Sequence, residues 1–154
     1  MMKDAILPES DWSMPTKAKS FFLSPDLHNR VDAVVNRMRQ LPGFGHVQFI
    51  ILYGSAAENR MTKESDIDLC IYYEGERMDA ARFRYAVLSG LSGTGYDIQV
   101  FQHLPLYVRV EVLKGTPVFI RNIRFLYDKA TETLRDFEEF KHRLYDYTGQ
   151  DAIR

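Results

Sequence analysis

The chain has 154 residues, a length typical of one domain, and 45% of them are hydrophobic, which is enough for a substantial core. Its net charge of −1 argues against a nucleic-acid partner, and its single cysteine, Cys70, excludes a disulfide within the chain. No apolar run approaches the roughly 20 residues of a membrane span, and the N-terminus lacks a signal-peptide pattern, so a cytoplasmic protein without membrane contact is expected.

The N-terminal residues 1–23 have no clear hydrophobic period, and they are predicted to form an irregular arm. Ser24 followed by Pro25 is typical of a helix start, because serine can cap a helix and proline needs no backbone partner at the first position. Apolar residues then recur at helical spacing until Pro42 and Gly43, which end the predicted helix.

Two strands, a helix and a third strand are predicted next. Residues 46–53 and 66–73 are rich in β-branched and aromatic side chains, which favours strands, and residues 96–101 have the same character. The helix lies between the second and third strands, at residues 77–91. Five of its apolar residues are expected to face inward: Met78, Ala81, Phe83, Val87 and Leu88.

The remaining elements complete a small domain. Pro105 is predicted to open a short helix that Gly115 closes. Residues 117–122 predict a fourth strand, and a long helix is expected over residues 123–147. This order of elements predicts an α/β or α+β domain at residues 24–122, with a small mixed sheet of about four strands flanked by helices.

The C-terminal region, residues 123–154, carries an apolar stripe along its predicted long helix. One interpretation is that the stripe packs on its own domain. The other is that the distal half extends beyond the small sheet and contacts a partner protein or a second copy, which would form a homodimer. The stripe comprises Ile123, Leu126 or Tyr127, Ala130, Leu134, Phe137, Phe140 and Leu144.

Two acids, Asp66 and Asp68, interrupt the apolar second strand. Because strand side chains alternate, both carboxylates point to one face while Ile67 and Leu69 point to the core. Acids so placed repel each other and lose solvation. A divalent cation such as Mg²⁺ that bridges them would compensate for both effects. Asp97 opens the third strand and joins them if the two strands are neighbours. Three carboxylates that hold two metal ions suit in-line displacement at phosphorus.

A Gly-Ser pair, Gly54 and Ser55, directly follows the first strand. Glycine lets the backbone approach a ligand closely, and free N–H groups beside a serine hydroxyl can hold a phosphate. Each motif alone has a structural explanation, since a D-x-D pair occurs on exposed edge strands and a Gly-Ser pair often forms a turn. Together, ten residues apart and followed by a third acid, they indicate phosphoryl or nucleotidyl transfer.

This set of motifs resembles the minimal nucleotidyltransferases of the DNA polymerase β-like superfamily. Their signature is Gly-Ser, ten residues, D-x-D and a later third acid, and about residues 26–121 share the pattern. The signature residues in this chain are Gly54, Ser55, Asp66, Asp68 and Asp97. A closing stretch of the family is matched by Leu104, Pro105, Arg109 and Gly115.

The resemblance implies a nucleotidyltransferase fold and transfer of a nucleoside monophosphate to an acceptor hydroxyl, with AMP from ATP as the first choice. It implies that Gly54 and Ser55 hold the phosphates. It also implies that Asp66, Asp68 and Asp97 hold Mg²⁺ or Mn²⁺, two ions in all, and that Asp97 helps to deprotonate the acceptor.

The resemblance also implies partners. Stand-alone members of this size resemble antitoxins that adenylylate a tyrosine of a HEPN ribonuclease toxin and so silence it. ATP or another nucleoside triphosphate and a HEPN-type protein are therefore the expected partners.

The chain departs from many relatives directly after the Gly-Ser pair. Those relatives carry Arg-Ala-Arg-Gly where residues 56–59 read Ala-Ala-Glu-Asn, so two positive charges are lost and Glu58 adds a negative one. Arg60 and Lys63 either replace that charge at the phosphates or lie solvated on the surface. Two alternatives therefore stay open: a weakly active or inactive module that acts by docking a partner, and a transferase of small molecules.

Overall fold

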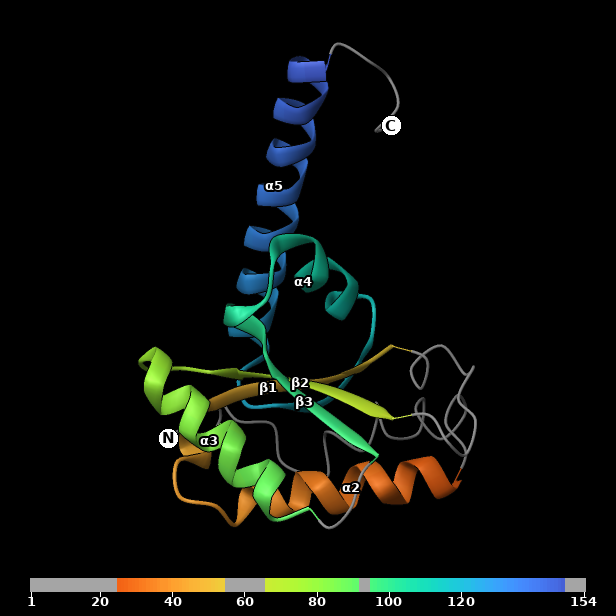
Figure 1. Cartoon of the computed structure of the whole chain (residues 1–154), viewed down its shortest axis with the longest axis vertical. Helices are drawn as coiled ribbons and strands as arrows, with labels where there is room; N and C mark the ends of the chain where they lie inside the picture. The colour runs from red at the N-terminus through yellow and green to blue at the C-terminus, as the bar shows by residue number, and fades with distance from the viewer. Residues whose placement is uncertain (1–24, 55–65, 92–94, 149–154) are drawn as a thin grey trace.

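The computed structural model describes residues 25–54, 66–91 and 95–148. They form a four-stranded sheet in the order β3-β2-β1-β4, with helices on both faces and a long C-terminal helix (Figure 1). The prediction of a mixed α+β domain with about four strands is thereby confirmed. The predicted arm, residues 1–23, lies outside the described residues.

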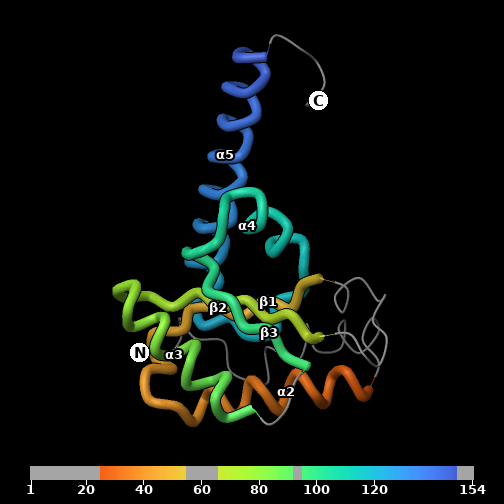
Figure 2. The backbone as a smooth tube through the Cα atoms, in the orientation of Figure 1, coloured from red at the N-terminus to blue at the C-terminus, as the bar shows by residue number. Residues whose placement is uncertain are grey.

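The sheet is mixed, and this decides which strand ends meet. β1 is antiparallel to both β2 and β4, whereas β2 and β3 are parallel. A parallel pair needs a crossover connection, which α3 (Arg77–Ser89) provides. The end of β1 and the starts of β2 and β3 consequently lie at one end of the sheet (Figure 2). The strands are β1 (Val47–Tyr53), β2 (Ile67–Tyr73), β3 (Tyr96–Val100) and β4 (Thr116–Ile120).

The main core lies on the face of the sheet that α2 (Pro25–Arg39) and α3 cover (Figure 1). α2 turns the predicted helical stripe inward, and every apolar member of that stripe from Leu27 to Met38 is buried. The strands contribute the residues that alternate with the acids, such as Ile67 and Leu69. The burial of large aliphatic side chains between α2 and the sheet holds this layer together.

α3 turns a different stripe inward from the predicted one. Ala80, Phe83 and Val87 are buried, whereas Met78 and Ala81 are exposed, so the prediction was wrong for these two residues. At about 100° per residue, Ala80 and Val87 share the side of Phe83, while Met78 lies about 140° away from it. Phe83, which packs on Tyr73 at 5.2 Å between ring centroids, therefore sets the orientation of the helix.

A smaller core lies on the opposite face, beneath α4 (Leu106–Leu113) and the first turns of α5 (Ile123–Thr148). In α4, Val110 and Val112 are buried. This second cluster contains Phe49, Ile51, Cys70, Phe101 and Val112.

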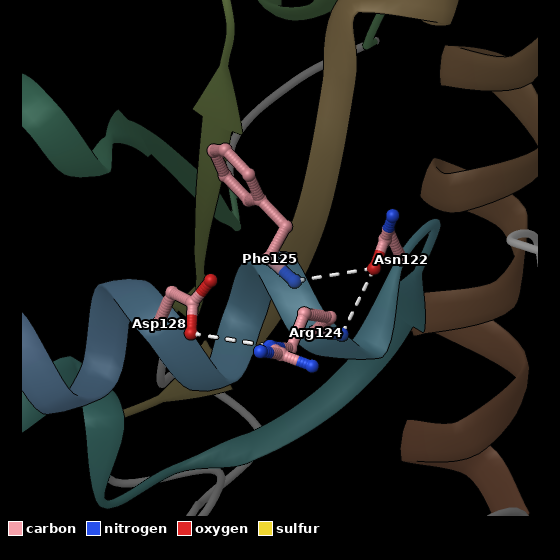
Figure 3. Close-up of polar contacts among 4 residues, drawn as sticks. All are labelled: Asn122, Arg124, Phe125 and Asp128. Carbon is pink, nitrogen blue, oxygen red and sulfur yellow. Dashed lines mark hydrogen bonds and ion pairs between the residues drawn. The ribbon is translucent and has the colours of Figure 1, made fainter.

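Asn122 fixes the start of α5. Its Oδ1 accepts hydrogen bonds from the backbone N–H groups of Arg124 at 2.9 Å and Phe125 at 3.2 Å (Figure 3). A side-chain oxygen in this position satisfies N–H groups that have no partner within the helix. The capped turn directs the ring of Phe125 onto the second core, where it meets Phe49 and Tyr72.

The distal half of α5 projects away from the sheet (Figure 1). Thr133 is the one residue of α5 that is buried, while Leu134 is 48% and Phe140 45% exposed. The first turns therefore pack on the domain and the apolar stripe continues beyond it. Among the helices of the described residues, none combines the length and the apolar character needed to cross a membrane.

Candidate active site

The structure brings Asp68 and Asp97 together. They are directly paired in the parallel register of β2 and β3, so their Cα atoms are neighbours across the sheet. Both lie opposite the main core, because Ile67, Leu69 and Ile98 on either side of them are buried there. Asp66, the residue immediately before β2, is exposed at the same end of the sheet. The expected pairing of Asp68 with the third acid is therefore observed, and Asp66 lies at the same end of the sheet.

The carboxylates of Asp66 and Asp97 are close enough to Asp68 to interact with it electrostatically. Burial, followed by the charges of Asp97 and Asp66, raises the pKa of Asp68 to about 6. Asp97 accepts a hydrogen bond from Gln99 Nε2 at 3.0 Å, which holds its carboxylate but adds no positive charge. Within the described part of the chain, no lysine, arginine or histidine forms an ion pair with these acids.

The donor set suits a hard divalent cation. Oxygen donors with uncompensated negative charge are the ligands that Mg²⁺ and Mn²⁺ prefer. As the side chains stand, no three His, Cys, Asp or Glu residues in ranges 25–54, 66–91 and 95–148 form a ready metal-holding group. Binding would therefore require the carboxylates to turn toward a common point, and the charge on Asp68 supplies the electrostatic drive for that movement.

Gly54 closes this end of the sheet against Asp68. Its φ of 77° is the left-handed conformation that glycine adopts freely. A Cβ added there would lie 2.4 Å from Asp68 Oδ2, so a side chain would collide with the acid. The turn after β1 thus approaches the carboxylates closely because the residue is glycine. The other predicted phosphate-binding residues, Ser55, Arg60 and Lys63, lie outside the described residues.

Tyr53 belongs to the same row of side chains, although sequence reasoning did not select it. It pairs with Asp68 in the antiparallel register of β1 and β2, so Tyr53, Asp68 and Asp97 lie side by side on three strands. Burial raises its pKa, and so does its electrostatic interaction with Cys70, Asp97 and Asp68. The sequence did contain a signal for Tyr53, because it is the last residue of the apolar strand and directly precedes the Gly-Ser pair.

Arg109, which matches the family's arginine, holds the fold. Its Nε donates a hydrogen bond to the carbonyl oxygen of Leu104 at 3.1 Å, which ties α4 to the turn before it. This contact lies within the α4 segment and involves none of the three acids, so it assigns Arg109 a structural role.

The family model for the polymerase β nucleotidyltransferase domain matches residues 39–124, more than half of the chain. The chain therefore belongs to this nucleotidyltransferase family. The matched range runs from the end of α2 to the start of α5 and contains Gly54 and all three acids. It leaves out the distal part of α5.

A curated relative extends the comparison. The chain is 42% identical over 69 residues to MJ1547 of Methanocaldococcus jannaschii, which is provisionally named a protein adenylyltransferase. The match covers 45% of this chain and 52% of MJ1547, so the chain spans about half the length of that relative.

Solved structures share the fold. A chain of a toxin–antitoxin complex with AMP-PNP superposes with a TM-score of 0.59 at 14% identity, covering 82% of this chain and 98% of that chain. A chain from the complex of tri-AMPylated Shewanella oneidensis HEPN toxin with MNT antitoxin superposes with a TM-score of 0.53 at 13% identity, covering 82% and 95%. The toxin–antitoxin MntA–HepT gives a TM-score of 0.53 at 13% identity. At these identities the likeness establishes the fold.

Proposed function

We propose that the chain transfers AMP from ATP to a hydroxyl group of a HEPN-type partner protein. The observation that carries this proposal is the row of carboxylates on β2 and β3 directly beside the glycine turn that ends β1. Two comparisons support the choice of reaction and acceptor: the provisional name of MJ1547, and the complex of an MNT antitoxin with a tri-AMPylated HEPN toxin.

In the proposed reaction, an oxygen of the acceptor bonds to the α-phosphorus of ATP and the bond from that phosphorus to the leaving oxygen breaks, which releases pyrophosphate. Asp66, Asp68 and Asp97 would hold Mg²⁺ or Mn²⁺, two ions in all, and such ions supply neutralisation of the phosphate charge. Asp97 would take the proton of the acceptor hydroxyl.

The turn after β1 would hold the nucleotide phosphates. At Gly54 the absence of a Cβ leaves the backbone open to a ligand beside Asp68, and Ser55 would add its hydroxyl group. Tyr53 would form one wall of the site, because its half-buried ring lies in the same row as the two strand acids. A rigid wall limits where the nucleotide can move relative to the carboxylates.

The partner would dock on the distal half of α5. This half leaves the domain with its apolar stripe uncovered, and Phe137 and Phe140 stack on it at 6.4 Å between ring centroids. Exposed aromatic residues on a rigid helix are typical anchors of protein interfaces. An open hollow on the same half is lined by Phe140, Arg143, Leu144, Asp146 and Tyr147.

The test is label transfer from ATP labelled at the α-phosphate, in the presence of Mg²⁺ and a HEPN-type partner protein. Wild-type protein is expected to label a tyrosine of the partner, and Asp66→Ala to reduce labelling about 100-fold or more. Asp79→Ala, which removes an exposed acid on α3, serves as the matched control and should label normally. Undiminished labelling by Asp66→Ala would refute the metal assignment.

A second candidate is a binding module that silences its partner by docking alone. The uncovered stripe of α5 and the loss of two arginines after Ser55 favour it. The Asp66→Asn, Asp68→Asn double variant separates the two candidates. If that variant inhibits the partner as fully as wild-type protein does, docking suffices. If it binds the partner but fails to inhibit, AMP transfer is required.

A further inference from the structure

The candidate site has a surplus of negative charge that a nucleotide would increase. Asp66, Asp68 and Asp97 already repel one another, and Glu58 stands where many relatives have an arginine. A bound triphosphate adds further negative charge, and cationic side chains near the glycine turn are needed to neutralise it in addition to metal ions. A cationic side chain that the tertiary structure brings near Gly54 would meet this need.

Lys114 is 60 positions from Gly54 in the chain, but its neighbour Gly115 lies against the last residues of β1. Leu52 of β1 pairs with Thr116 of β4, and Lys114 is the residue at the end of α4 that directly precedes Gly115. Gly115 confirms how closely the two segments approach. A Cβ added to it would lie 2.2 Å from the carbonyl oxygen of Leu52 and 3.0 Å from Tyr53 Cβ.

The side chain of Lys114 is on the face that carries the acids. Its Nζ lies 3.1 Å from Glu111 Oε2 on α4, the helix that covers the sheet face to which Asp68 and Asp97 point. Both partners are exposed, Lys114 by 68% and Glu111 by 59%. An ion pair this exposed contributes little free energy, so the ammonium group can leave Glu111 for a stronger anion at small cost.

Arg30 is another cation near this end of the sheet, and its position suits the task less well. Its guanidinium group lies 5.6 Å from the ring centroid of Tyr96. Tyr96 packs on the main core, across the sheet from Asp97. Arg30 therefore holds α2 against the start of β3, whereas Lys114 is on the face of the sheet to which the acids point.

We infer that Lys114 binds the β- and γ-phosphates of the nucleotide by moving from Glu111 to the phosphate oxygens beside Gly54, an inference that rests on the proposed nucleotidyltransferase function. Lys114 is then a substrate-binding residue contributed by the loop between α4 and β4. Glu111 holds it in place while the site is empty and competes with the nucleotide for it. The positive charge missing from the segment after Ser55 is thereby supplied from another part of the chain.

The test measures binding of ATP, pyrophosphate and AMP to the full chain by calorimetry in Mg²⁺. Lys114→Gln should weaken ATP and pyrophosphate binding about tenfold and leave AMP binding unchanged, because AMP lacks the two outer phosphates. Lys114→Arg should restore most of the affinity. Glu111→Gln should tighten ATP binding by a much smaller factor, because it removes an acid that competes only weakly for the lysine. These opposite effects distinguish phosphate binding from a structural role.

The matched control is Lys141→Gln. Lys141 Nζ lies 3.1 Å from Glu138 Oε2 with the same three-residue spacing as the Glu111–Lys114 pair, but it is on α5, away from the acids. It should bind ATP like wild-type protein. If wild-type protein binds ATP and Lys114→Gln binds it equally well, this inference is wrong and the proposed function stands. If wild-type protein binds no ATP, both are wrong.

Discussion

At the residue scale, the backbone conformation of Gly54 determines how closely the turn after β1 approaches a charged residue of the site. Its positive φ ends β1, and its missing side chain lets the turn lie against Asp68. Gly43 offers an internal comparison, since it also has a positive φ, 96°, and its added Cβ would lie 2.8 Å from the hydroxyl oxygen of Tyr73. The two glycines are alike in backbone strain and in crowding, but Gly43 is remote from the acids.

Gly54→Ala and Gly43→Ala are expected to cost similar stability and to differ in activity. Each forces an alanine into the left-handed region, which costs about 1–2 kcal/mol of unfolding free energy. Gly54→Ala additionally displaces the Asp68 carboxylate, so AMP transfer should fall by more than about tenfold. Urea unfolding and label transfer measure the two quantities. Equal activities of the two variants would contradict the role given to Gly54.

Asp68 should make stability depend on pH. Its folded-state pKa of about 6 is above the usual 3.8, so the stability that its protonated form provides is present below that window and lost as the pH rises through 6. At pH 8, Asp68→Asn should therefore unfold with about 1 kcal/mol more free energy than wild-type protein, after allowance for solvent screening. The difference should shrink toward pH 4.

Thermal unfolding at pH 4 and pH 8 measures this effect. Asp136→Asn, which removes an exposed acid on α5, is the control and should follow wild-type protein. Adding Mg²⁺ at pH 8 should raise the Tm of wild-type protein and leave that of Asp68→Asn almost unchanged, because the cation binds the ionised carboxylate. A variant that gains no stability at pH 8 would show that the acids do not repel one another as described.

At the element scale, α5 does two things along its length. Its first turns cap the second core through Asn122 and Phe125, and its distal turns carry apolar side chains away from the domain. Sequence periodicity showed the stripe but left both interpretations of it open. The pattern does not reveal how far along the helix the domain extends. The structure shows that the first turns of α5 pack beside α4 and that the distal turns are exposed, while contact of the distal turns with a partner stays a prediction. A homodimer through this helix stays a prediction.

Phe140→Glu is expected to weaken binding of the HEPN-type partner by more than about tenfold while leaving the chain folded. Phe140 is 45% exposed, so its replacement should change the unfolding free energy by about 0.5 kcal/mol at most. Tyr85→Glu replaces an exposed aromatic residue on α3 and should bind the partner normally. Co-purification and calorimetry provide the measurement, and normal binding by Phe140→Glu would place the docking surface elsewhere.

Strand positions followed from residue type, whereas the inward face of α3 did not. β1 and β2 are continuous runs of β-branched and aromatic residues, a pattern that few other elements share. The apolar stripe of α3 is weak. Either Ala80 or Ala81 could face the core, and the apolar residue Met78 is not on the buried side. The packing of Phe83 on Tyr73 determines which side of α3 faces the core, which the small alanine residues do not.

At the scale of the whole molecule, the sequence by itself determined the motif set and its chemistry, because the spacing from the Gly-Ser pair to D-x-D and the period of a strand are local properties of the chain. Only the tertiary structure decided that β2 and β3 are neighbours, which pairs Asp68 with Asp97. It alone placed Tyr53 in the same row and Gly115, the neighbour of Lys114, against the end of β1. Strand order and register bring distant segments together, and no local pattern records them.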